Sequence, residues 1–147
     1  MQIDVDNRYY DLANCLRRVY TQFLEPVRRK WALSQGELDV LLFFANNPQY
    51  HRASDMVNHR GFSKAHVSAL VAGLEGRGLL AGCGDPADRR AVQLELTALA
   101  DDPVADGREA QQAFFHAISQ GIPEEDLSAW VRVNETVARN LEQMDNS

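Results

Sequence analysis

The sequence contains only two cysteines in 147 residues, Cys15 and Cys83. Two thiols are too few for a disulfide framework, and neither lies in the spacing of a metal-binding motif. No apolar run reaches the length that spans a membrane, and the first residues do not form the pattern of a signal peptide. We therefore expect a cytoplasmic protein without a cofactor, a bound metal or a membrane partner.

The sequence also lacks the motifs of common enzyme active sites. It has no Gly-rich phosphate loop, no dinucleotide-binding fingerprint and no ordered hydrolytic triad. The histidines do not pair with another metal ligand at helical spacing, as zinc sites on helices require; they are His51, His59, His66 and His116. Neither an enzyme nor a metal centre is expected.

The composition predicts a single ordered domain, because 45% of the residues are hydrophobic and 24% are charged. The net charge of −6 argues against a nucleic-acid partner, but its distribution does not. Residues 50–90 hold six basic and four acidic residues, an excess of two positive charges. Since charges act over a Debye length of about 8–10 Å, a weakly basic face on an acidic body is compatible with DNA, and favours a dimer.

A short helix is predicted to begin after Ser63, whose hydroxyl can cap the free N–H groups of the first turn. Its inward face carries apolar residues at positions i, i+3, i+4 and i+7, namely Val67, Leu70, Val71 and Leu74. Its opposite face is small and polar, with Lys64, His66, Ser68 and Ala69. Gly76 and Gly78 end the helix.

A β-hairpin is predicted to follow this helix. Residues 79–83 form one arm, and residues 92–97 form the other with alternating apolar and polar residues. The Gly-, Asp- and Pro-containing turn between them carries Arg89 and Arg90. Because the major groove accepts a helix and the narrow minor groove attracts arginine, the pair of elements suits a DNA duplex.

These segments resemble the winged helix-turn-helix of MarR-type (multiple antibiotic resistance regulator) transcription factors. The resemblance rests on G-F-S-K-A-H-V-S at 61–68, L-E-G-R-G-L-L at 74–80, D-P-A-D-R-R-A at 85–91 and L-T at 96–97. The wing-tip pattern D-x-x-D-R-R-A is the most specific part. Ala69 departs from the family, which often has arginine there, so one expected DNA contact is missing.

The expected DNA contacts come from both elements. Lys64 is placed near a guanine or a phosphate, and His66 and Ser68 near base edges. The helix N-terminus at Ser63 is expected to face a phosphate. At the wing tip, one of Arg89 and Arg90 enters the minor groove while Asp88 orients it.

The rest of the chain predicts further helices. A helix over 7–30 contains Pro26, which we interpret as a kink or an early end. Ser34 and Glu37 form a capping box for the next helix, and residues 50–52 are expected to add a short strand to the wing. Residues 53–60 form the first helix of the helix-turn-helix. Asp102 and Pro103 are expected to cap and open a helix, and the last helix covers residues 123–144.

The predicted fold is mainly α with a small β-wing, in one domain over 1–147. Residues 34–97 form the winged helix-turn-helix, and the flanking helices, 7–33 and 102–145, form a helical dimerisation region. The resemblance implies a two-fold homodimer that binds a pseudo-palindromic double-stranded DNA operator, and thus a transcriptional regulator, more specifically a repressor.

The resemblance also implies a small aromatic or phenolic effector, in a crevice between the dimerisation helices and the DNA-binding lobe. The expected pocket residues are Tyr20, Phe23, Phe43 and Phe115, although aromatic residues at helical spacing are also typical of a core. Two alternatives remain open. One is a winged-helix protein-interaction module without DNA binding, and the other is a redox-sensing regulator in which arginines near Cys15 activate the thiol.

Overall fold

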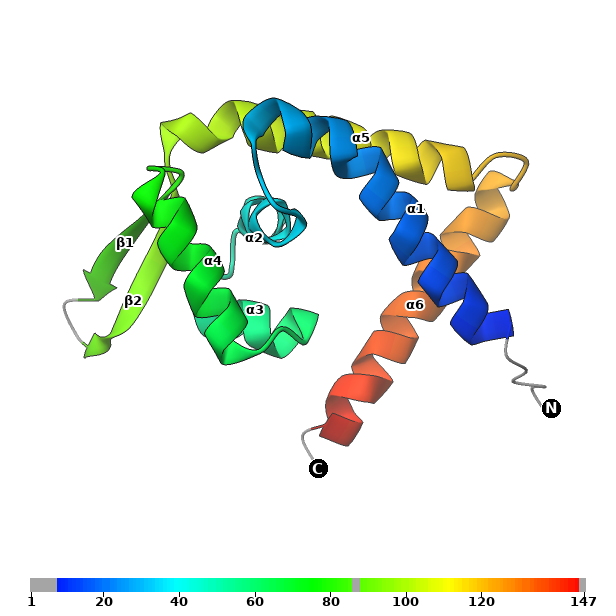
Figure 1. Ribbon diagram of the computed structural model, residues 1–147. Helices are drawn as coiled ribbons and strands as arrows, with labels where there is room; N and C mark the ends of the chain where they lie inside the picture. Colours follow the sequence, from blue (N-terminus) through cyan, green and yellow to red (C-terminus); the bar gives the residue numbers. More distant parts are fainter. Residues whose placement is uncertain (1–7, 86–87, 146–147) are drawn as a thin grey trace. The chain divides into compact units, whose positions relative to one another are not determined.

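The computed structural model describes residues 8–85 and 88–145, apart from the side chains of residues 85 and 88–91 (Figure 1). The chain divides into two compact units, residues 1–113 and 114–147. Within the described residues there are six α-helices and one two-stranded antiparallel sheet, which confirms the predicted mainly-α fold with a β-wing. In chain order, the elements are α1 (Arg8–Trp31), α2 (Gln35–Asn46), α3 (Ala53–Arg60), α4 (Lys64–Gly76), β1 (Leu80–Asp85), β2 (Asp88–Leu96), η1 (Ala98–Ala100), α5 (Asp101–Ile118) and α6 (Glu124–Asp145).

Helix α1 runs through Pro26 without ending, so the predicted early end is wrong. Pro26 is exposed, and therefore the carbonyl that loses its N–H partner faces solvent. Leu24 and Val27, on the other side of the same turn, are buried and hold the helix against the core. Packing of one apolar face thus maintains the helix where local propensity alone would end it.

Helix α2 is the centre of the first unit, with α1 and α5 on one side and α3 and α4 on the other (Figure 1). Its N-terminus has the predicted capping box: Ser34 Oγ accepts from the Glu37 N–H at 3.1 Å, and Glu37 Oε2 accepts from the Ser34 N–H at 2.8 Å. The helix is buried on most sides, through Leu38, Val40, Leu41, Leu42, Phe43 and Phe44. Leu42 leaves no room for a side chain at Gly107, where a Cβ would lie 2.9 Å from its Cδ2.

The turn between α3 and α4 is formed as predicted. Gly61 has φ of 69°, in the left-handed region, and its N–H donates to the Val57 carbonyl at 3.2 Å. Such a residue ends α3 and lets the chain reverse into α4 without a Cβ clash. Helix α4 then buries Val67, Val71 and Leu74 against α2 and α3.

The wing is an antiparallel hairpin that pairs Leu80 with Leu96 and Gly84 with Val92, followed by a register shift at Gly84/Asp85. The predicted third strand at residues 50–52 is wrong. One backbone bond, from the Leu94 N–H to the His51 carbonyl at 2.6 Å, takes its place, too little pairing to form a strand.

Helix α5 begins at Asp101, two residues before the start at Pro103 that a cap at Asp102 requires, so that prediction is also wrong. The single 3₁₀ turn η1 brings the chain from Thr97 directly into a helix at Asp101. Pro103 is still tolerated, because N–H groups of the first helical turn have no intrahelical partner.

The second unit consists of the end of α5, a turn at Gly121 with φ of 75°, and α6. Among the described residues of α6 none is buried. Its large apolar side chains are instead exposed, and they are Trp130, Val131, Val133, Val137, Leu141 and Met144.

Candidate nucleic-acid interface and cavity

The outer face of α4 is open and polar. Ser63 caps the helix, with its Oγ accepting from the His66 N–H at 3.1 Å. Lys64, Ser68 and Ala69 are exposed on the following turns. The predicted contact residues therefore share one surface that begins at a helix N-terminus, where free N–H groups and the helix dipole favour an anion.

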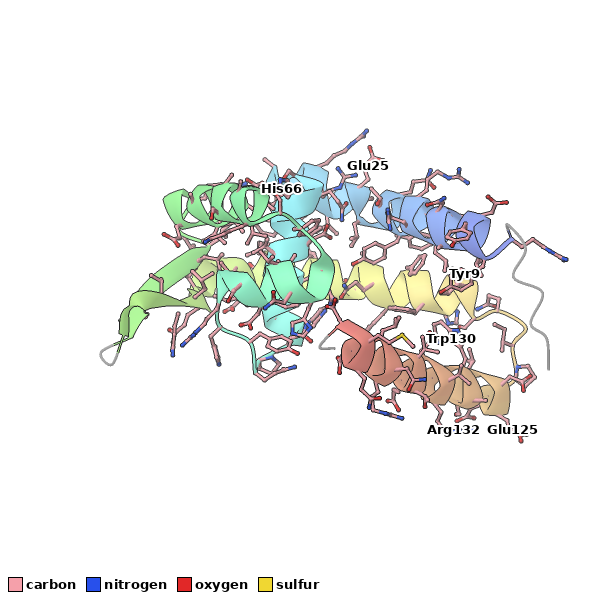
Figure 2. All side chains as sticks on the ribbon, turned by 90° about the horizontal axis from the view of Figure 1, so that it is seen from below. Tyr9, Glu25, His66, Glu125, Trp130 and Arg132 are labelled. Carbon is pink, nitrogen blue, oxygen red and sulfur yellow. The ribbon has the colours of Figure 1, made fainter. Side chains whose placement is uncertain are left out.

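His66 lies at the N-terminal end of α4, next to α2 (Figure 2). Its ring packs edge-on against Phe62, with 5.3 Å between centroids, and Nε2 would lie 3.5 Å from a Cβ at Gly36. The ring therefore packs against Phe62 beside α2, while the residue as a whole stays exposed, as Lys64 is.

The wing-tip residues belong to the predicted interface, but their side chains lie outside the described residues. The backbone of Asp88, Arg89 and Arg90 opens strand β2. The contacts expected for these three side chains remain predictions.

Two basic side chains, Arg77 and Lys30, form hydrogen bonds within the fold. Arg77, at the end of α4, donates to the carbonyls of Trp31 and Ala32 at 2.7 and 2.8 Å, and so caps the C-terminus of α1. Lys30 pairs with Asp106 of α5 at 2.7 Å. This hydrogen bond raises the pKa of Lys30 and lowers the pKa of Asp106.

A cavity of about 680 Å³ lies inside the first unit. Its apolar wall comes from α2, α3 and the turn before α4, through Leu42, Phe43, Met56 and Phe62. Arg17 of α1 and Arg60 of α3 supply positive charge. The guanidinium carbon of Arg60 lies 5.0 Å from the centre of the Phe43 ring, an arrangement that favours a cation over the ring.

The polar wall of the cavity contains two hydrogen-bonded pairs. Gln111 of α5 donates to the Tyr20 hydroxyl at 2.8 Å, and Gln35 donates to Asp39 Oδ1 at 2.8 Å. Burial raises the pKa of Tyr20, and the Gln111 hydrogen bond opposes this shift. Burial likewise raises the pKa of Asp39, while the Gln35 hydrogen bond and the charges of Arg60 and Arg28 act in the opposite direction.

The cavity contains two of the four predicted pocket residues, Tyr20 and Phe43. Phe23 does not line it, and Phe115 belongs to the second unit, where it packs edge-on against Phe114. The sequence analysis missed the polar wall. Gln35, Asp39 and Gln111 carry no motif, and only the i, i+4 spacing of the first two indicates a contact.

An aromatic stack joins the cavity to α3. The Phe43 ring lies parallel to Tyr50, with 5.6 Å between centroids, and Tyr50 stacks on His59 at 4.5 Å. Arg60, beside His59 on α3, contacts the same Phe43 ring. The cavity wall and the first helix of the helix-turn-helix are therefore in direct contact.

Both cysteines are exposed and free, and the Arg18 guanidinium lies 3.6 Å from the Cys15 sulfur. Within residues 8–85 and 88–145, no three His, Cys, Asp or Glu side chains converge on a possible metal position. In the same residues no helix combines the length and the apolar character needed to cross a bilayer.

The structure resembles solved structures of transcriptional regulators. Transcriptional regulator PA3341 shares 25% identity and a TM-score of 0.79, over 92% of this chain and 98% of its own. BpsR of Bordetella bronchiseptica, whose DNA binding is regulated by 6-hydroxynicotinic acid, shares 20% identity and a TM-score of 0.69, over 89% and 98%. NadR, solved in complex with 4-hydroxyphenylacetate, shares 19% identity and a TM-score of 0.75, over 94% and 96%.

At such identities BpsR and NadR demonstrate a shared fold. No curated protein matches the chain significantly in sequence. Residues 33–91, which include α2, α3, α4 and β1, match the model of the MarR family. This match and the shared fold confirm the resemblance to MarR-type regulators that the helix-turn-helix and wing motifs indicated.

Proposed function

We propose that this protein is a sequence-specific double-stranded DNA-binding transcriptional regulator, a repressor that acts as a homodimer and responds to a small aromatic effector. The observation that carries the proposal is the outer face of α4. It is exposed, it carries Lys64 in the first turn and Glu75 in the last, and it begins at a capped helix N-terminus. A helix of this kind fits the major groove, where each base pair is distinguishable.

The exposed apolar surface supports the homodimer. Trp130 and Leu141 of α6 are 52% and 60% exposed, and Leu12 near the start of α1 is 57% exposed. Exposed apolar surface of this kind, present on each of the two units, marks an interaction site. A second copy is the natural partner, because a palindromic operator needs two α4 helices about 34–36 Å apart.

The cavity supports the effector. It is lined by Arg60, Gly61 and Phe62, which form the end of α3 and the turn that positions α4. A ligand there touches the segment that sets the direction of α4. It acts as an inducer if it binds the DNA-free arrangement more tightly than the DNA-bound one.

Fluorescence anisotropy with duplexes from the intergenic region beside the gene tests the proposal. We expect the Arg89→Ala/Arg90→Ala double variant to lose affinity at least about tenfold, because it removes the minor-groove contact. Lys64→Ala is expected to weaken binding as well. The matched control is Arg132→Ala/Arg139→Ala on α6, which removes the same charge from exposed positions and should leave affinity within about twofold.

One observation favours a winged-helix module that binds protein instead of DNA. Ala69 is exposed on α4 where the family often has arginine. In that case no duplex from the locus binds at low salt, and the wing variants have no effect. The same anisotropy assay tests a redox role for Cys15. If Cys15 senses oxidants, peroxide should release DNA from the wild type but not from the Cys15→Ser variant.

A further inference from the structure

The wing projects from the helical part of the first unit and is attached to it along the outer edge of β2 (Figure 1). The Leu94 N–H donates to the His51 carbonyl at 2.6 Å. Among the described residues, no other backbone hydrogen bond joins the hairpin to the segment between α2 and α3. Because each N–H of a strand points to one side only, that of Leu94 cannot also bond to β1. The His51 carbonyl is therefore its partner in the fold.

A single side chain fixes the direction of this carbonyl. The His51 carbonyl and the Arg52 N–H belong to the same planar peptide group. The Arg52 N–H donates to Asp55 Oδ2 at 3.0 Å, and the His51 N–H donates to the same oxygen at 3.2 Å. Asp55 thus holds one end of the peptide group whose other end binds Leu94. A rotation that turned the carbonyl away from β2 would break the bond to Asp55.

The ordinary interpretation of Asp55 is a helix cap, because it is the third residue of α3. Its bond to Arg52, the N-cap residue, fits that role. Its bond to His51 extends beyond the helix, to the one residue of the segment that bonds to the wing. The preceding residue, Tyr50, is stacked between a ring of α2 and a ring of α3, so this segment is also held on its other side.

We propose that Asp55 is a positioning residue for DNA binding, which orients the wing through the His51 carbonyl without contacting DNA itself. Arg90 precedes Leu94 by four residues in β2, about 13 Å along the strand. A wing that moved freely at Leu94 would have to be ordered when it binds a duplex, and such ordering reduces affinity. This inference rests on the proposed DNA-binding function.

Two variants separate the hydrogen bonds of Asp55 from its charge. Asp55→Ala and Asp55→Asn remove the same negative charge, so any direct effect of charge on DNA affinity is equal in both. Both bonds go to one carboxylate oxygen, and the amide oxygen of Asp55→Asn can still accept them. Only Asp55→Ala therefore releases the peptide group of His51.

Amide hydrogen exchange followed by NMR, without DNA, tests the attachment itself. In Asp55→Ala the Leu94 amide should exchange at least about tenfold faster than in the wild type, and in Asp55→Asn at nearly the wild-type rate. The control is the amide of Val67 in α4, which donates to the Ser63 carbonyl at 3.0 Å and should stay slow in all three proteins. Faster exchange of both amides would mean that Asp55 stabilises the whole lobe, which would overturn the inference.

Fluorescence anisotropy tests the effect on DNA binding. Asp55→Ala should bind the duplex about fivefold more weakly than Asp55→Asn, because its wing is no longer ordered in advance. In the Arg89→Ala/Arg90→Ala background the same pair should differ less than about twofold, since a wing without its arginines has no contact to position. A purely structural role of Asp55 would give the same ratio in both backgrounds.

The inference is wrong if Leu94 exchanges at the same rate in the wild type and in Asp55→Ala. It is also wrong if the fivefold ratio persists without the two wing-tip arginines. Failure of the proposed function gives a different result: no duplex binds to the wild type, while Leu94 still exchanges faster in Asp55→Ala.

Discussion

Helices α2 and α6 are both rich in apolar residues, but they differ in how much of their surface the chain buries. Helix α2 buries six side chains within its twelve residues, whereas none of the 22 residues of α6 is buried. Burial of a leucine stabilises a fold by about 1.5–3 kcal/mol, so α2 is supported by its own chain. The apolar surface of α6 is not buried by the described residues, and in the proposed homodimer the second copy would bury it.

Of the three substitutions that test this difference, Leu41→Ala should have the largest effect on stability. Leu41 is fully buried in α2, and removing its side chain leaves a cavity in the core. We expect the free energy of unfolding to fall by about 2–5 kcal/mol, independently of protein concentration. Chemical denaturation at two concentrations measures it. A loss below about 1 kcal/mol would mean that α2 is not the core of this unit.

Leu141→Ala is the matched change in α6. It should have a smaller effect, and this effect should be on dimerisation and not on the core. Leu141 is exposed in the single chain, so the substitution leaves no cavity there. We expect the dissociation constant of the dimer to rise about tenfold, which corresponds to about 1.4 kcal/mol. Analytical ultracentrifugation over a concentration series tests this. If the wild type sediments as a monomer throughout, the proposed dimer is wrong.

Ser34→Ala should have the smallest effect of the three. It removes the side-chain half of the capping box at the start of α2. The expected loss of stability is about 1 kcal/mol, again independent of concentration. Ser34→Asp restores an N-cap acceptor and should recover most of the lost stability, measured by the same chemical denaturation. A full loss in both variants would show that the hydroxyl has another role.

Local patterns predicted most of the fold. The capping box at Ser34, the left-handed turn at Gly61 and the cap at Ser63 each depend on a few neighbouring residues, and all three are present. The alternation after Val92 likewise indicated strand β2. These features could be predicted because their physical causes lie within one turn of helix or one strand.

The errors and omissions have distant causes. Helix α1 continues through Pro26 because Leu24 and Val27 on its opposite face are packed in the core. Helix propensity describes single residues and contains no information about such packing. The Tyr20 and Gln111 pair joins residues 91 positions apart, and Arg77 bonds a carbonyl 46 positions earlier. The spacing of apolar and polar residues along the sequence does not predict contacts over such distances. The polar wall of the cavity therefore becomes visible only once the chain is folded.

The two hydrogen bonds of Arg77 restrict how α4 can move. They tie its last turn to the end of α1, whereas Gly61 connects its first turn through a single left-handed residue. A helix of 13 residues is about 20 Å long, so a tilt of about 10° around Arg77 displaces the opposite end by about 3 Å. Such a tilt would pivot at Arg77 and would displace Ser63 and Lys64 at the N-terminal end of α4.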